Sequence, residues 1–157
     1  MDQKKSIIQF IKFGLVGVSN TLVDWLVFYL LKAIFNVARE GEPIIKAIAF
    51  LVAMLNSYYW NTVWTFKDEY KGAVAKEENA KGQIFIKFVV VSLIGWVINY
   101  YSFDYTRLTL GQSSIVSLIV ASAAATLWNF FANKLWTYKA ANGRQTIPNN
   151  RQRIEQS

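Results

Sequence analysis

Two polar residues inside the first apolar run of the sequence could serve a chemical role in a membrane. Asn20 and Asp24 are four residues apart, so a helix places them on one face. A carboxylate inside an apolar helix is costly and is a functional-site candidate by default. The alternative is a structural Asp that bonds to a neighbouring helix or lies close enough to the interface to be hydrated. We therefore take Asn20 and Asp24 as candidate substrate contacts.

A second set of residues clusters at the ends of apolar runs and could bind a phosphate. It combines lysines, asparagines and tryptophans: Lys12, Lys87, Lys134, Asn61, Asn129, Asn133, Trp64 and Trp136. Tryptophan favours headgroup level because its ring is apolar while its N–H needs a polar partner. Lysines beside amide donors suit a phosphate at the inner headgroup level. The alternative is ordinary anchoring, because basic and aromatic residues surround most membrane-helix ends.

The composition argues against several kinds of chemistry. The sequence has no cysteine for a disulfide or thiolate, and no histidine, the commonest general base and metal ligand. It shows no acid and base paired with a nucleophile and no glycine-rich phosphate loop. We therefore expect no enzyme activity, cofactor or metal. The net charge of +7 could indicate nucleic acid, but basic residues in a membrane chain more often mark the cytoplasmic side, so we expect no nucleic-acid partner.

Four apolar runs must position these residues. Each reaches about 20 residues, the length that a bilayer core requires, and they cover residues 10–34, 44–64, 84–105 and 115–136. The alternative is a soluble helical protein with a large core, but 54% of the residues are hydrophobic, which is high for a soluble domain. We predict an all-α, polytopic membrane protein with four transmembrane helices. The first run lacks a small-residue cleavage site, so we expect an uncleaved span.

The sequence also repeats itself. The pattern Asn-x-x-Trp-Thr-aromatic-Lys occurs at 61–67 and 133–139, and Phe-Ile-Lys-Phe occurs at 10–13 and 85–88. The offset is 75 residues at the start of the unit and 72 at its end. Two matches in the same order indicate duplication of a two-helix unit.

The duplication sets the expected domain organisation. We predict a single membrane domain over residues 1–157, divided into repeat one (about 9–67), a cytoplasmic loop (68–83), repeat two (about 84–139) and a disordered basic tail (140–157). Some matched positions differ between the repeats. Gly95 aligns with Asn20, Asn99 with Asp24, and Ser57 with Asn129.

The basic residues predict the orientation. All but four of the 17 lysines and arginines fall near the termini, the middle loop and the helix ends beside them; the four are Lys32, Arg39, Lys46 and Arg107. Basic residues prefer the cytoplasmic side, so both termini and the middle loop should be cytoplasmic. Four spans return the chain to its starting side, and the two repeats are then parallel.

These motifs resemble those of a known family. Residues 10–17, Asn20-Thr21 and Asp24 resemble the opening of the GtrA-like family, and the two Asn-x-x-Trp-Thr-aromatic segments resemble its second and fourth helix ends. The resemblance covers about residues 9–139. Repeat two departs from the pattern because it lacks the Asn-Thr and Asp equivalents, and the Asn-x-x-x-Asn pair is complete only as Asn129 and Asn133.

The resemblance implies a role in decorating cell-surface polysaccharide at the cytoplasmic membrane. Family members are thought to move a polyprenyl-phosphate-linked sugar from the inner to the outer leaflet, usually beside the glycosyltransferase that makes it. A membrane adaptor that recruits or stabilises that glycosyltransferase is the alternative. A small drug exporter is a weaker option, because such proteins usually centre on an intramembrane Glu. Four helices enclose little volume, so we expect a homo-oligomer or a partner complex, in contact with membrane lipid.

Overall fold

The computed structural model describes residues 3–36 and 41–139, and these residues are helical, without strands. The predicted all-α class is therefore confirmed. The predicted tail at 140–157 and Arg39 lie outside the described residues. The elements in chain order are α1 (Gln3–Ile34), α2 (Glu42–Trp60), η2 (Asn61–Thr65), α3 (Lys67–Val74), α4 (Ala80–Asp104), η3 (Tyr105–Thr109), α5 (Ser114–Ala132) and η4 (Asn133–Thr137), where η marks a π-helical turn.

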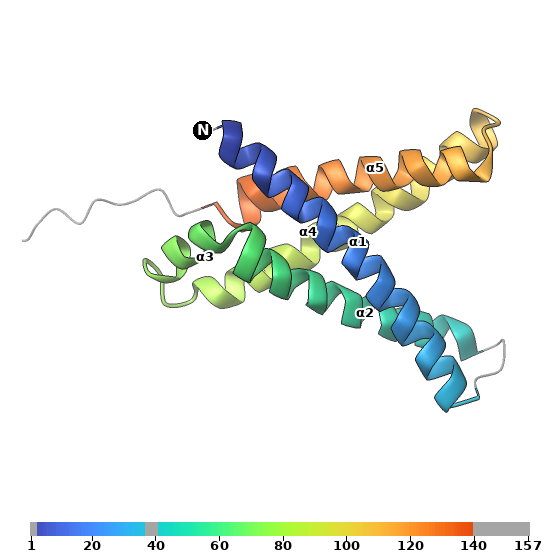
Figure 1. The fold of residues 1–157 in the computed structure, drawn as a ribbon, viewed down its shortest axis with the longest axis horizontal. Coiled ribbons are helices and arrows are strands. Elements are labelled where there is room, and N and C mark those ends of the chain that lie inside the picture. Colours follow the sequence, from blue (N-terminus) through green and yellow to red (C-terminus); the bar gives the residue numbers. More distant parts are fainter. Residues whose placement is uncertain (1–2, 37–40, 140–157) are drawn as a thin grey trace, which may run out of the picture.

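The long helices form two hairpins that cross each other. α1 packs along α2 and α4 packs along α5, while the hairpins meet through α1 against α5 and α2 against α4. The hairpins lie together at the end of the molecule that carries α3, which we call the α3 end (Figure 1). They separate toward the two short interhelical turns, which we call the turn end (Figure 1).

Three helical segments of the described chain are long and apolar enough to cross a membrane. They are α1, α4 continued by η3, and α5 continued by η4. The fourth predicted span corresponds to α2 and η2, which are not among these three. The count of four spans, and the side on which each terminus lies, therefore remain predictions.

The α3 end contains more helix than the sequence indicated. α1 begins at Gln3 instead of about residue 10, α3 occupies part of the predicted loop, and α4 begins at Ala80 instead of about residue 84. Side-chain contacts explain the early start of α1. Lys5 Nζ lies 2.9 Å from Glu69 Oε1, and Gln9 Nε2 donates to the same oxygen at 2.9 Å. Burial raises the pKa of Glu69, but these hydrogen bonds outweigh it, so the pKa lies below its usual value.

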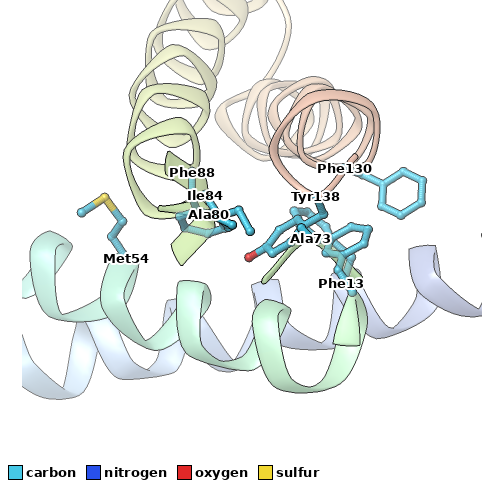
Figure 2. Close-up of a cluster of buried hydrophobic side chains, with 9 residues drawn as sticks. Phe13, Met54, Ala73, Ala80, Ile84, Phe88, Phe130 and Tyr138 are labelled. Carbon is cyan, nitrogen blue, oxygen red and sulfur yellow. The ribbon is translucent and has the colours of Figure 1, made fainter. Parts of the chain in front are cut away.

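The buried hydrophobic core also lies at the α3 end. It joins Phe13, Met54, Phe66, Ala73, Ala80, Ile84, Phe88, Phe130 and Tyr138. Figure 2 shows Phe13, Phe88, Phe130 and Tyr138 converging where the two hairpins meet. Phe66 and Tyr138 hold matched positions in the two repeats, and their rings stack with centroids 4.6 Å apart. The duplicated motif thus supplies both halves of the central contact.

Each Asn-x-x-Trp-Thr motif forms a π-helical turn. The Phe66 N–H donates to Asn61 O at 2.8 Å, and the Tyr138 N–H donates to Asn133 O at 2.8 Å. Both bonds span five residues, one more than in an α-helix. The extra residue rotates the following chain and delivers Phe66 and Tyr138 to the core. π-Helical turns occur often at functional sites.

Candidate functional site

A polar cavity lies between the two hairpins. Its volume is about 340 Å³, and its lining comes from α1, α2, α4 and α5: Phe13, Gly14, Gly17, Val18, Asn20, Thr21, Ser57, Asn99, Ser122, Ala125, Thr126 and Asn129. A second cavity of about 210 Å³ lies on the α2–α4 side. The two cavities share five lining residues, namely Asn20, Ser57, Asn99, Ala125 and Asn129. These shared residues form the wall between two polar spaces at the hairpin crossing, which we call the crossing residues.

The lining of both cavities mixes polar and apolar side chains. Asparagine amides and hydroxyl groups supply its polar atoms, and no lining residue, all of them in the described part of the chain, carries a charge. The Asn129 Oδ1 atom is buried without a hydrogen-bond partner among the described residues. An amide offers both donors and an acceptor, as a sugar hydroxyl does. The lining can therefore bind a neutral polyhydroxylated group.

Gly95 makes room for Asn129 at the crossing. A Cβ atom on residue 95 would lie 2.4 Å from Asn129 Oδ1, closer than real Cβ contacts allow. In repeat one the larger residue of the matched pair, Asn20, lies on the first helix, and the smaller one, Ser57, lies on the second. Asn20 Oδ1 accepts a long hydrogen bond of 3.4 Å from Asn56 Nδ2. Each repeat thus contributes one asparagine from this pair of positions.

The predicted lysines and tryptophans do come together in pairs. Lys12 Nζ lies 5.3 Å from the centre of the Trp64 ring, and Lys87 Nζ lies 5.8 Å from that of Trp136. These are cation–π distances. The two pairs occupy matched positions, so both repeats carry the same cationic group at the α3 end.

Lys134 has different neighbours. Its Nζ atom donates to Ser6 Oγ at 2.6 Å and lies 5.4 Å from the centre of the Phe130 ring. It therefore joins the end of α5 to the start of α1. Repeat one has Thr62 at the matched position, and Thr62 is buried against Tyr138, with 2.9 Å between the two hydroxyl oxygens.

Asn61 and Asn133 are buried within the π-helical turns. Each is 1% exposed, and its amide donates to a backbone carbonyl, that of Ser57 at 2.9 Å and that of Asn129 at 2.8 Å. The Oδ1 atoms of both are buried without a partner among the described residues. These amides stabilise the turns, and we do not include them in the proposed substrate contacts.

Asp24 forms an ion pair with Lys46 of α2. It lies on the α1–α2 hairpin and is not one of the residues that line the two cavities. The matched Asn99 in repeat two does line both. A structural carboxylate bonded to a neighbouring helix would have this arrangement, so we do not assign Asp24 to substrate binding.

Sequence reasoning selected Asn20 and Asn129 as site residues but not the other polar lining residues. Ser57, Asn99, Thr21, Ser122 and Thr126 complete the cavity. One signal could have found one of them, Ser57. On the first helix of each repeat, the large Asn20 is matched by the small Gly95, and on the second helix the small Ser57 is matched by the large Asn129. This opposite change in size indicates that the two positions contact each other at the crossing.

Comparison with known proteins supports the membrane assignment. The family model described as the GtrA/DPMS transmembrane domain matches residues 12–138. An uncharacterized membrane protein, YngA, from Bacillus subtilis is 29% identical over 127 residues, covering 81% of this chain and 77% of that protein. The described apolar helices and this match together show that the protein is a membrane protein.

Two other relatives carry functional names. A bactoprenol-linked glucose translocase from Shigella phage SfV is 25% identical over 134 residues, covering 84% of this chain and 96% of that protein. A dolichol-phosphate mannosyltransferase from Pyrococcus furiosus is 29% identical over 114 residues, covering 70% of this chain and 28% of that protein. Because the family model covers most of its length, this chain belongs to the GtrA/DPMS transmembrane-domain family.

Proposed function

We propose that this protein moves a polyprenyl-phosphate-linked sugar from the inner to the outer leaflet of the cytoplasmic membrane. One observation carries the proposal: an uncharged cavity of amides and hydroxyls lies between helices whose outer surfaces are apolar. A sugar inside a bilayer needs hydrogen-bond partners, because an unpaired polar group in an apolar medium costs several kcal/mol. The crossing residues supply such partners.

The two lysine–tryptophan pairs can attract the phosphate of the lipid. Lys12 and Lys87 lie beside Trp64 and Trp136 at the α3 end, where the predicted orientation places the inner leaflet. Each cation near an anionic surface contributes about 1 kcal/mol of attraction. We assign these lysines to gathering the anionic lipid, and the cavity to its sugar. The name of the SfV relative, a bactoprenol-linked glucose translocase, supports the same class of substrate.

A leaflet-resolved assay tests this proposal. Purified protein is reconstituted in vesicles that hold a fluorescent polyprenyl-phosphate glucose in the inner leaflet, and the sugar exposed outside is measured with an impermeant enzyme or oxidant. The proposal predicts exposure much faster than in vesicles without protein. Equal rates in the two preparations would reject translocation by this chain alone.

A second function has its own support. The Pyrococcus relative is named a mannosyltransferase, and this chain matches only 28% of it, so there a region like this chain is part of a larger protein named for sugar transfer. We therefore retain an adaptor that recruits or stabilises a polyprenyl-phosphate glycosyltransferase. Co-purification of a glycosyltransferase, together with no translocation by the isolated chain, would favour the adaptor. We also propose a homo-oligomer, which cross-linking in native membranes would test.

A further inference from the structure

Two seams join the hairpins, and the duplication relates one to the other. The α1–α5 seam is closed at the α3 end by Phe130, whose ring lies 5.1 Å from Phe10 and 5.7 Å from Phe13. The α2–α4 seam is closed by Tyr58, whose ring lies 5.1 Å from Phe85 and 5.4 Å from Phe88. Since Tyr58 matches Phe130, and the two phenylalanine pairs match each other, the seams have the same aromatic closure.

Next to this closure the seams differ in bulk. Along α1–α5 most of the cavity lining is small, with Phe13 and Val18 as the bulkier members beside Gly14, Gly17, Thr21, Ser122, Ala125 and Thr126. Along α2–α4 the corresponding cavity is lined by three bulky side chains, Phe50, Met54 and Trp96, beside the small Ser57, Ser92 and Gly95. A Cβ atom built on Gly14 or Gly17 would meet no described atom within 4 Å, so these glycines face open space. The α1–α5 seam is the wider path into the cavity.

The seams also differ in the position of a lysine. The α1–α5 seam ends at Lys134, whose ammonium group lies at the junction with Ser6 of α1. The matched position beside the α2–α4 seam is Thr62, a buried neutral residue. On the α4 side of the second seam, Lys81 holds the position that matches Ser6, so each seam has one lysine at this end. Lys134 differs because it bridges its seam to Ser6 and can attract an anion that enters from the bilayer beside the aromatic closure. The bulk of the lining and the position of Lys134 therefore favour the α1–α5 seam.

We propose that the α1–α5 seam is the side entrance through which the lipid-linked sugar reaches the cavity. The phosphate binds Lys134 in place of Ser6, the sugar passes Gly17 toward Asn129, and the hydrocarbon chain stays in the bilayer outside the seam. This inference rests on the proposed function, because it assumes a phosphate-linked lipid as the substrate. It assigns entry of the substrate to the α1–α5 seam and not to the matched α2–α4 seam.

The chain has no cysteine, so single cysteines can carry a bulky group that is added after folding. Gly17→Cys and Ser92→Cys occupy matched positions in the two seams and line the two cavities. Each variant is labelled with a bulky maleimide in vesicles, and binding of a photoactivatable polyprenyl phosphate glucose is measured by cross-linking. We expect labelling at position 17 to lower cross-linking at least about tenfold, and labelling at position 92, which lines the smaller cavity, to lower it several times less. Equal losses, or a greater loss at position 92, would overturn the assignment.

Lys134 has a matched control nearby. Lys139 is exposed one residue after Tyr138, so Lys139→Gln removes the same charge from the same end of the molecule without touching the seam. Removing any such lysine should weaken lipid binding by up to about fivefold. We expect Lys134→Gln to weaken binding well beyond that of Lys139→Gln, and equal effects would remove Lys134 from the path.

Mapping the cross-linked residues tests the entrance independently of translocation. Cross-linked peptides are mapped with the wild-type protein, and the entrance predicts labels on α1 and α5. Labels on α2 and α4 would reject the entrance even if translocation is measured. Labels on α1 and α5 without translocation would keep the entrance as a lipid site and reject the translocase.

Discussion

The two halves of the chain share a frame but fill it differently at the hairpin crossing. In the first half the larger residue, Asn20, comes from α1 and faces the smaller Ser57; in the second half the smaller residue, Gly95, comes from α4 and adjoins Asn129 of α5. The exchange keeps one amide from each half. Each half thus places one asparagine and one smaller residue at the crossing, and the helix that carries the asparagine is exchanged between the halves.

The halves differ most in their membrane charges. Repeat one pairs Asp24 with Lys46, whereas repeat two has Asn99 and Leu118 at the matched positions. Lys46→Leu should lower the free energy of unfolding by about 2–3 kcal/mol, because it leaves a carboxylate without a partner inside an apolar helix. Asp24→Asn should cost less, since Lys46 is 55% exposed and can extend toward water.

The double variant Asp24→Asn/Lys46→Leu reproduces the repeat-two pair and should recover most of the loss. Reversible unfolding in mixed micelles measures the free energy of unfolding of all three variants. If Lys46→Leu proves no more costly than Asp24→Asn, the ion pair contributes nothing specific.

The pairing of one large and one small residue at the crossing can be disrupted by one substitution and restored by a second. Gly95→Asn introduces a side chain into space that Asn129 occupies, and such overpacking typically costs about 1–3 kcal/mol. Adding Asn129→Ser gives repeat two the same pair as repeat one and should rescue thermal stability. Failure of the double variant to rescue, with both single variants folded, would show that the two crossings do not share one contact.

The stacked pair offers a smaller test. Tyr138 carries a hydroxyl that Phe66 lacks, and that oxygen lies 2.9 Å from Thr62 Oγ1. Burial raises the pKa of Tyr138, so the group stays protonated and able to donate. Tyr138→Phe makes the pair symmetric and should cost about 1 kcal/mol, the usual contribution of one hydrogen bond. A melting temperature unchanged from wild type would mean that stacking alone holds the pair.

The smallest expected effect is on pH dependence. The folded-state pKa of Glu69 lies below its unfolded value, so its contacts with Lys5 and Gln9 stabilise the protein above the unfolded pKa. That contribution is lost as pH falls through the folded pKa, and for a part-exposed group it should be below about 1 kcal/mol. Glu69→Gln should flatten the acid limb of the stability profile. An identical acid limb in the variant would assign the pH dependence to other groups.

The sequence predicted what depends on local pattern. Hydrophobic length predicted the helices, and the duplicated motif predicted that Lys12 and Lys87 would have equivalent surroundings. The lining of the cavity was harder to predict, because Asn99 and Ser57 reach it only through the angle at which the hairpins cross. Asp24 was recognised as unusual, but its partner Lys46 depends on the register between α1 and α2. The π-helical turns were missed, since a single inserted residue leaves no periodicity to detect.

We propose that the crossing residues bind the sugar during translocation, and substituting them in the leaflet-resolved assay tests this role. Asn99→Leu and Asn129→Leu remove amides from the cavity but keep the number and branching of the side-chain heavy atoms, while Ser19→Leu changes an exposed residue of α1 that does not line it. Each amide lost should slow exposure of polyprenyl-phosphate glucose at least about fivefold, the equivalent of one hydrogen bond. The control should stay within about twofold of wild type. Wild-type rates in both asparagine variants, at equal reconstituted amounts, would contradict the claim.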